Sequence, residues 1–131
     1  MPLKNLNHLL IRARDVDATR DFYCDVLGLA EGERPPFPFK GYWMYIGDQA
    51  VVHLAERAPE NDGNDTGAID HVAFEATGLT DMLARLETLG IPAHNRKVPG
   101  QGLHQVFVSD PNGVMIELNY AAVEGEGIDA D

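Results

Sequence analysis

The second half of this chain repeats the first, and a duplication restricts the fold to two similar modules more strongly than composition does. The segment Asn7–Arg12 (NHLLIR) returns as Asp70–Glu75 (DHVAFE), 63 residues further along the chain. Near the end of each half, Ala50–Leu54 matches Val114–Leu118 at almost the same spacing. Shifts of one residue in this spacing are what loop insertions produce. We therefore expect two copies of one small module.

Hydrophobic periodicity predicts the same order of elements in both halves: a strand, a helix and three further strands. In the first half we expect a strand at 6–12, a helical stripe from Val16 to Leu27 after the cap residue Asp15, and strands near 30–34, 42–46 and 50–56. In the second half we expect a strand at 69–76, a helix at 79–89 and strands near 93–97, 103–109 and 114–120.

These elements predict an α+β fold and define the organisation of the chain. The first βαβββ module spans residues 1–57 and the second spans 68–120. Residues 58–67 are rich in Pro, Gly, Asn and Asp and have the composition of a linker. Residues 121–131 carry acidic side chains and no basic ones, which predicts a frayed, disordered tail.

The alternation of side chains along a strand sorts the polar residues by face. In the opening strand Leu9 and Ile11 share one face, and His8 looks the other way. In its repeat Val72 and Phe74 take the apolar face, so His71 is left on the opposite one. We expect the apolar faces to pack against the helices.

The closing strands follow the same alternation and leave His53 and Glu117 on the face away from the helices. An ionised carboxylate between Ile116 and Leu118 needs a partner. If a pseudo-twofold axis relates the halves, His8, His53, His71 and Glu117 converge on one point. Three imidazoles and a carboxylate suit a first-row divalent metal. Taken alone, His8 or His71 is better explained as an ordinary hydrogen-bonded residue, and it is their shared face with Glu117 that favours a metal site.

Charge and composition exclude several other classes of partner. The 131 residues include 21 acidic and 10 basic side chains, a formal net charge of −11, so neither nucleic acid nor an anionic membrane is expected as a partner. No apolar run is long enough to span a bilayer or to act as an export signal. The single cysteine, Cys24, excludes an internal disulfide and fits a cytoplasmic location.

Together these segments resemble the vicinal oxygen chelate superfamily, which includes glyoxalase I, methylmalonyl-CoA epimerase, extradiol dioxygenases, and the fosfomycin and bleomycin resistance proteins. The resemblance covers about Leu6 to Tyr120 and is carried by His8, by Thr19–Tyr23 leading to Val26–Leu29, by Asp70–Phe74, and by Phe107–Gly113 running into Ile116–Leu118. It implies an open mixed sheet cup with helices on its outer face, one divalent metal per site, and frequently a homodimer, either with or without exchange of modules.

Carried over by position, the resemblance implies His8, His71 and Glu117 as metal ligands, with His53 at the fourth position. Glyoxalase-like and epimerase-like members usually place Glu or Gln there, so His53 is a departure. Three ligands leave three metal positions free, enough for a catecholate and dioxygen. A fourth protein ligand leaves two free coordination positions, which suits a metal that acts as a Lewis acid on an enediolate. His53 is therefore either a ligand or a nearby acid–base group, and with Glu117 it is our candidate for catalysis.

Further residues are candidates for binding a small-molecule substrate. Aromatic side chains precede His53 and predict a pocket wall for a planar or apolar compound, although core or dimer packing explains them equally well. His104 lies beside the 100–102 loop, and Arg12 shares the face of His8. The substrate-binding candidates are Trp43, Tyr45, Phe39, His104 and Arg12.

Three functions remain open. The two-histidine, one-carboxylate set and the aromatic segment favour an extradiol-type dioxygenase using Fe(II) or Mn(II) on an aromatic diol. The alternative is a glyoxalase-type lyase or isomerase using Ni(II) or Zn(II). A non-catalytic binding or resistance protein is the third, and it is less favoured because such binders commonly lack the metal residues that this chain keeps.

Overall fold

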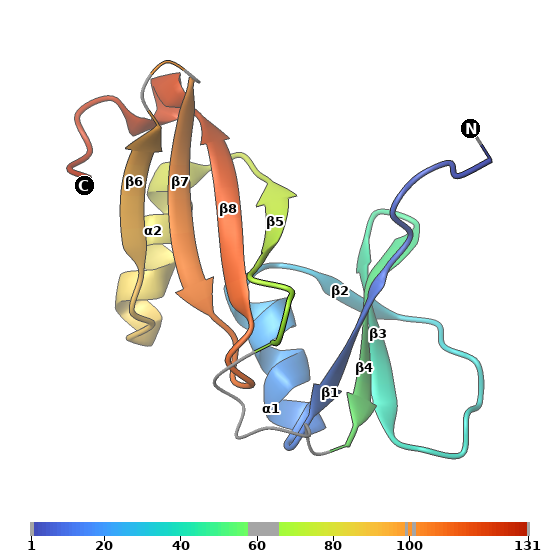
Figure 1. Ribbon diagram of the computed structural model, residues 1–131. Coiled ribbons are helices and arrows are strands. Elements are labelled where there is room, and N and C mark those ends of the chain that lie inside the picture. The colour runs from blue at the N-terminus through green and yellow to red at the C-terminus, as the bar shows by residue number, and fades with distance from the viewer. Residues whose placement is uncertain (1, 58–65, 99, 101, 131) are drawn as a thin grey trace. The chain divides into compact units, whose positions relative to one another are not determined.

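The computed structural model describes residues 2–57, 66–98, 100 and 102–130. The chain forms two compact units, Met1–Asp62 and Gly63–Asp131. The boundary between them falls inside the predicted linker, of which residues 58–65 lie outside the described part of the chain. Each unit carries one mixed, four-stranded sheet, so the structure has the predicted α+β character (Figure 1).

The first unit follows the order strand, helix, three strands. Its elements are β1 (Leu9–Ala13), α1 (Val16–Asp21), the π-helical segment η1 (Phe22–Val26), β2 (Ala30–Gly32), β3 (Gly41–Ile46) and β4 (Gln49–Glu56). The strands lie in the order β1-β4-β3-β2, with β1 parallel to β4 and the other pairs antiparallel. The helix α1 begins where predicted, because the Asp15 side chain accepts a hydrogen bond from the Ala18 amide.

The second unit repeats this order. Its elements are β5 (Val72–Glu75), α2 (Leu79–Leu89), β6 (His94–Val98), β7 (Leu103–Ser109), β8 (Met115–Ala121) and the 3-10 helix η2 (Ala122–Gly125). The strand order β5-β8-β7-β6 has the same pattern, with β5 parallel to β8. Among the described residues, no helix is both long enough and apolar enough to cross a bilayer.

Several predicted elements differ in their limits from the structure, and two of them show the reasons. The opening strand begins at Leu9 and not at Leu6, because its pairing with β4 starts at Leu9 and Val52, and Leu6 is exposed. The predicted helix changes at Phe22 to a wider turn, in which the Leu27 amide donates to the Phe22 carbonyl. This turn buries Phe22, Tyr23 and Val26. A hydrophobic stripe in the sequence does not distinguish an α-helix from a π-helical turn.

The core of each unit lies between its helix and one face of its sheet. In the first unit it contains Val16, Tyr23, Met44, Val52 and Leu54. In the second it contains Leu79, Leu86, Val106, Ile116, Leu118 and Tyr120. These are the apolar faces that strand alternation predicts, and the polar residues between them lie on the other face of each sheet.

The expectation of a frayed tail is wrong for the residues directly after β8. Both Glu124 and Gly125 belong to η2, and Gly125 is buried. A Glu124 carboxylate oxygen accepts hydrogen bonds from the amides of Gly78 (2.9 Å) and Leu79 (3.0 Å). Helix α2 has Gly78 at its cap position and therefore no capping side chain of its own. The acidic segment supplies the missing acceptor, which charge composition alone does not reveal.

Replacing Glu124 with alanine is expected to lower the free energy of unfolding by about 0.5–2 kcal/mol, the usual effect of losing a helix N-cap. Urea denaturation followed by circular dichroism measures this change. The control is Glu126→Ala, which removes an exposed carboxylate two residues away and is expected to change stability by no more than about 0.5 kcal/mol. Equal stabilities for the two variants would contradict the capping role.

Candidate functional site

The second unit brings His71 and Glu117 together. His71 directly precedes β5, and Glu117 lies in the middle of β8, opposite Ala73. The His71 Nε2 atom is 3.4 Å from Glu117 Oε1. The Glu117 side chain is only 12% exposed, although it lies on the face of β8 opposite to the core residues Ile116 and Leu118. The pair therefore presents one imidazole nitrogen and one carboxylate oxygen at the same place.

Neighbouring polar groups fix the orientation of both side chains. The Asp70 carboxylate lies 2.8 Å from His71 Nδ1, which leaves Nε2 as the free nitrogen. The Asn119 amide donates to Glu117 Oε2 (2.9 Å) and accepts a bond from Gln105 (3.1 Å). Metal-binding histidines and carboxylates commonly have such partners, which hold the coordinating atoms in place. Our sequence reasoning missed Asn119, although its position two residues after Glu117 puts it on the same strand face.

The first unit brings together His8, His53 and Trp43. The His53 ring stacks on His8 at 3.8 Å between centroids and on Trp43 at 3.9 Å, with planes within 12° of parallel in both cases. Trp43 lies opposite His53 in the β3–β4 pairing. The Asn7 side-chain oxygen is 2.8 Å from His8 Nδ1, the same contact that Asp70 makes with His71. The repeated Asn-His and Asp-His dipeptides thus leave Nε2 free in both histidines.

In this conformation His8 and His53 do not bind the same metal ion. An imidazole coordinates in the plane of its ring, at about 2.0–2.1 Å for zinc. The two ring planes are 3.8 Å apart and only 10° from parallel, so they do not meet within that distance. In addition, His53 Nε2 lies 3.1 Å from the Ala50 carbonyl oxygen. The geometry places His53 beside His8 as a pocket residue.

The surroundings shift the pKa values of His71 and His53 in opposite directions. The hydrogen bond to Asp70 raises the pKa of His71, and the nearby Glu117 carboxylate adds to this. Burial lowers the pKa of His53, and the charge of His8 acts in the same direction. Without a metal, His71 is therefore the more easily protonated of the two.

A cavity of about 350 Å³ opens beside the His8–His53 stack. It is lined by His8, Leu10, Arg34, Phe37, Phe39, Trp43, His53 and Leu54. Phe39 and Trp43 therefore lie where the aromatic wall was predicted. Arg12 is half-buried in β1 and is not among the described residues that line this cavity. Its contact with a substrate stays a prediction.

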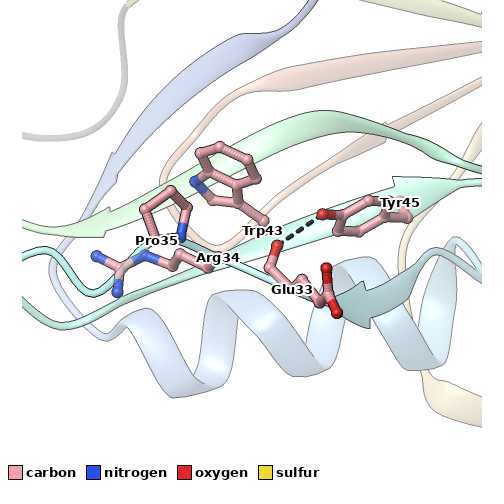
Figure 2. Close-up of a pocket in the computed structure, with 5 residues that line it drawn as sticks. All are labelled: Glu33, Arg34, Pro35, Trp43 and Tyr45. Atoms are coloured by element: carbon pink, nitrogen blue, oxygen red, sulfur yellow. Dashed lines mark hydrogen bonds between the residues drawn. The ribbon is translucent and has the colours of Figure 1, made fainter.

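Tyr45 lines a different cavity. The pairing of β3 with β4 passes from Met44–Val52 to Tyr45–Ala50, so the extra residue of this β-bulge is Val51 of β4. The alternation along β3 is kept, and Trp43 and Tyr45 both line this second cavity. The Tyr45 hydroxyl donates to the Glu33 carbonyl, and its ring helps to line an adjoining cavity of about 530 Å³ with Arg34, Pro35 and Trp43 (Figure 2).

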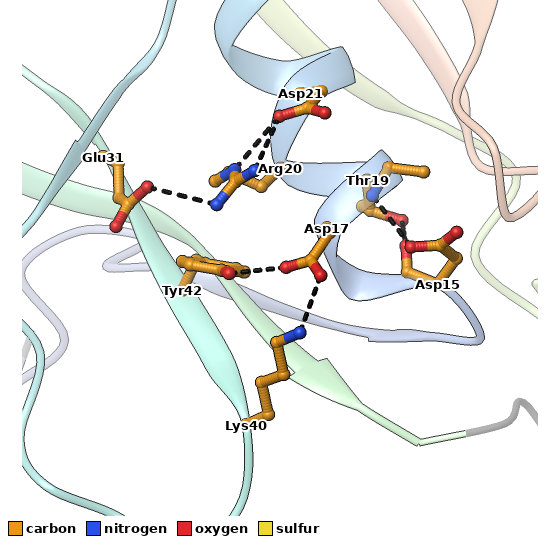
Figure 3. A network of polar contacts seen from close by, with 9 residues as sticks. Asp15, Asp17, Thr19, Arg20, Asp21, Glu31, Lys40 and Tyr42 are labelled. Atoms are coloured by element: carbon orange, nitrogen blue, oxygen red, sulfur yellow. Dashed lines mark hydrogen bonds and ion pairs between the residues drawn. The ribbon is translucent and has the colours of Figure 1, made fainter.

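Two other residues of the aromatic segment point toward α1. The Tyr42 hydroxyl and the Lys40 ammonium group both bind the Asp17 carboxylate, at 2.5 and 2.6 Å (Figure 3). These bonds lower the pKa of Asp17. Both side chains connect the loop and β3 to α1, so neither belongs to the cavity wall.

His104 is buried and lies on the face of its sheet away from Glu117, and its role in substrate binding stays a prediction. In the β7–β8 register Phe107 lies opposite Glu117, and His104 lies opposite Tyr120 on the other face. The His104 side chain is fully buried, with Nε2 bonded to the Asn95 side chain (2.8 Å) and the ring packed against Gly125. Tyr120 is equally buried, and burial raises its pKa to about 12. The neighbouring loop residue Gln101 lies outside the described part of the chain.

The buried His104 predicts a pH-dependent stability. Burial lowers the pKa of His104, and the charge of Lys97 adds to this. The unfolded chain then binds more protons than the folded one below the ordinary histidine value of about 6.5, so stability falls as pH falls from there toward the folded pKa. We expect the urea midpoint of the wild type to drop more between pH 7.5 and 5.5 than that of His104→Leu. An equal drop in both proteins would contradict this.

Within the described residues, no three His, Cys, Asp or Glu side chains form a metal-sized group. Each unit instead supplies a pair: His71 with Glu117, and His8 with His53. Imidazole and carboxylate donors suit a divalent metal such as zinc, nickel, iron or manganese. The contacts of Asn7 and Asp70 with Nδ1 of His8 and His71 are of the kind that orients metal-binding histidines. The structure thus defines the chain as an α+β protein built from two repeated βαβββ units, the second of which carries the His71–Glu117 pair.

Comparisons with known proteins give the family. The model of the Glyoxalase/Bleomycin resistance protein/Dioxygenase superfamily matches residues 5–118, and the chain belongs to this superfamily. It is 31% identical to "Glyoxylase I 4" of Arabidopsis thaliana, covering 88% of this chain and 70% of that protein. It is 27% identical to a lactoylglutathione lyase of Pseudomonas aeruginosa, covering 92% and 84%. A solved lactoylglutathione lyase structure from Agrobacterium tumefaciens matches with a TM-score of 0.68 at 27% identity, covering 95% and 99%.

Proposed function

We propose that this protein is a metal-dependent lyase or isomerase that acts on a small substrate with two adjacent oxygen atoms. The observation that carries the proposal is the His71–Glu117 pair. Asp70 contacts His71 Nδ1, and Asn119 donates a hydrogen bond to Glu117 Oε2. The names of the relatives support the lyase reaction over other chemistry of the superfamily.

In this proposal the metal ligands are His8, His71 and Glu117, the residues that the resemblance to the superfamily implies. The metal would act as a Lewis acid on the two substrate oxygens and favour removal of a proton from the adjacent carbon. The chain supplies the ligands in a fixed orientation, because Asn7 and Asp70 each hold Nδ1 of the following histidine. Fixed ligands favour binding because fewer side-chain rotations are lost when the ion arrives.

His53 is the proposed acid–base residue of the reaction. Its Nε2 atom faces the Ala50 carbonyl, which favours the tautomer with a proton on Nε2 and a free lone pair on Nδ1. That lone pair can accept a proton from a substrate in the cavity that His53 lines. The aromatic rings of Phe39 and Trp43 line the same cavity and offer the substrate an apolar surface.

A second candidate function is ring cleavage of an aromatic diol by an extradiol-type dioxygenase. The specific observation in its favour is the stacked geometry that keeps His53 from sharing an ion with His8. A set of two histidines and one carboxylate leaves room on the metal for both a diol and dioxygen. The aromatic wall of the cavity also suits a flat ring.

One experiment distinguishes the two functions. The protein is purified without oxygen, its metal content is measured by mass spectrometry, and hemithioacetals and catechols are assayed in parallel with an oxygen electrode. The lyase proposal predicts turnover of a hemithioacetal, or of a related hydroxycarbonyl compound, without oxygen uptake. Oxygen uptake with a catechol and bound iron or manganese would replace it with the dioxygenase. A protein that binds no divalent metal would contradict both.

A further inference from the structure

Arg34 is held rigidly at the edge of the cavity that contains His8 and His53. Its guanidinium carbon lies 5.2 Å from the centre of the Phe37 ring and 5.0 Å from that of Phe39. The two rings are themselves stacked, with centroids 5.4 Å apart and planes 9° from parallel. The Arg34 Nη2 atom donates to the Phe39 carbonyl oxygen at 2.8 Å. Arg34 and the two phenylalanines thus order one another within a single short segment.

The guanidinium of Arg34 also packs against Gly41. A Cβ atom on Gly41 would lie 3.1 Å from Arg34 Nη2 and 3.3 Å from Nε, so the guanidinium packs directly against the glycine backbone. A cation that is already ordered loses little conformational entropy when it binds a ligand. The arrangement therefore favours anion binding more than a freely rotating surface arginine would.

The charge of Arg34 is not balanced by an acidic side chain within the described residues. Its contacts are the Phe39 carbonyl and the two rings, whereas Arg20 and Lys40 of the same unit each pair with a carboxylate. This is notable in a chain with 21 acidic and 10 basic side chains. Several guanidinium N–H groups remain available for a ligand, and their planar arrangement matches a carboxylate.

We infer that Arg34 binds the carboxylate of a planar substrate, whose ring lies among Phe37, Phe39 and Trp43. Arg34 lines both the cavity of about 350 Å³ beside His8 and His53 and the adjoining cavity in Figure 2, so an anion there lies at the rim of the aromatic wall. The inference rests on the proposed function, because it takes this cavity as the substrate cavity. It narrows the substrate class to small conjugated or aromatic carboxylates.

Trp43, the single tryptophan of the chain, lines both cavities and provides the readout. Benzoate and the neutral benzamide are titrated into metal-free protein while tryptophan fluorescence is recorded. We expect saturable binding of benzoate, with an affinity about tenfold or more above that of benzamide, because only benzoate forms charge-assisted hydrogen bonds. Equal affinities, or no saturable change with benzoate, would overturn the inference.

Variants of Arg34 test the residue itself. Arg34→Gln is expected to weaken benzoate binding about tenfold or more and to leave benzamide binding unchanged, and Arg34→Lys should keep part of the preference. The control Arg96→Gln makes the same change of charge at an exposed position of β6 and should bind benzoate like the wild type. Unchanged benzoate binding by Arg34→Gln, with native circular dichroism, would overturn the role of Arg34.

Metal content separates this inference from the proposed function. Arg34→Gln should retain the metal content of the wild type, since Arg34 is not one of the proposed ligands. If the protein binds no metal but benzoate still requires Arg34, the proposed function fails and the anion site stands. If metal binding and lyase activity are as proposed but benzoate binds equally well without Arg34, only the anion site fails.

Discussion

Replacing Glu117 with glutamine is expected to reduce the affinity of the protein for a divalent metal by at least about a hundredfold. Loss of a residue that merely orients a ligand typically costs about 10–100-fold in metal affinity, and loss of a charged ligand costs more. Glutamine keeps the size of the side chain and its contact with Asn119, so the change isolates the charge next to His71. Competition with a chromophoric chelator measures the affinity.

Two further variants calibrate the Glu117 result. Asn119→Ala removes only the bond that holds Glu117 Oε2, and we expect a smaller loss of metal affinity, about tenfold. Glu87→Gln removes a charge from the exposed face of α2 in the same unit and should leave metal affinity unchanged. If Glu117→Gln binds metal like the wild type while folded, Glu117 is not a ligand.

Replacing Leu86 with alanine is expected to lower the free energy of unfolding by about 2–5 kcal/mol. Leu86 is 2% exposed on the face of α2 that contributes to the core of its unit, and truncation of a buried leucine leaves a cavity that the surroundings fill only in part. The matched control is Leu89→Ala on the same helix, where the side chain is 47% exposed and an effect within about 0.5 kcal/mol is expected.

Urea denaturation, recorded by circular dichroism, compares the two leucine variants. The comparison uses the transition of the second unit, because the chain divides into two compact units that need not unfold in one step. Similar losses of stability in Leu86→Ala and Leu89→Ala would contradict the packing of α2, since only one of these side chains is buried in the structure.

The best-predicted elements are those whose signals are local. Helix α2 was predicted at 79–89 and spans Leu79–Leu89, because a regular apolar stripe ends at Gly90, which adopts the left-handed conformation that favours glycine. Strand β7 likewise has the predicted limits, Leu103–Ser109. The opening strand was predicted too long because its first residues alternate in sequence but have no partner in β4.

The sequence by itself determined the duplication, the order of elements in each half, and the side of the sheet on which His8, His71 and Glu117 lie. These follow from repeated segments and from a period of two, and both are properties of neighbours along the chain. The tertiary structure decided that His104 is buried beneath Gly125, that Tyr42 bonds to Asp17, and that Glu124 caps α2. It also decided that His53 stacks between His8 and Trp43. Each of these contacts joins segments far apart in sequence, so it depends on strand register, a bulge or a helix end, which no local pattern encodes.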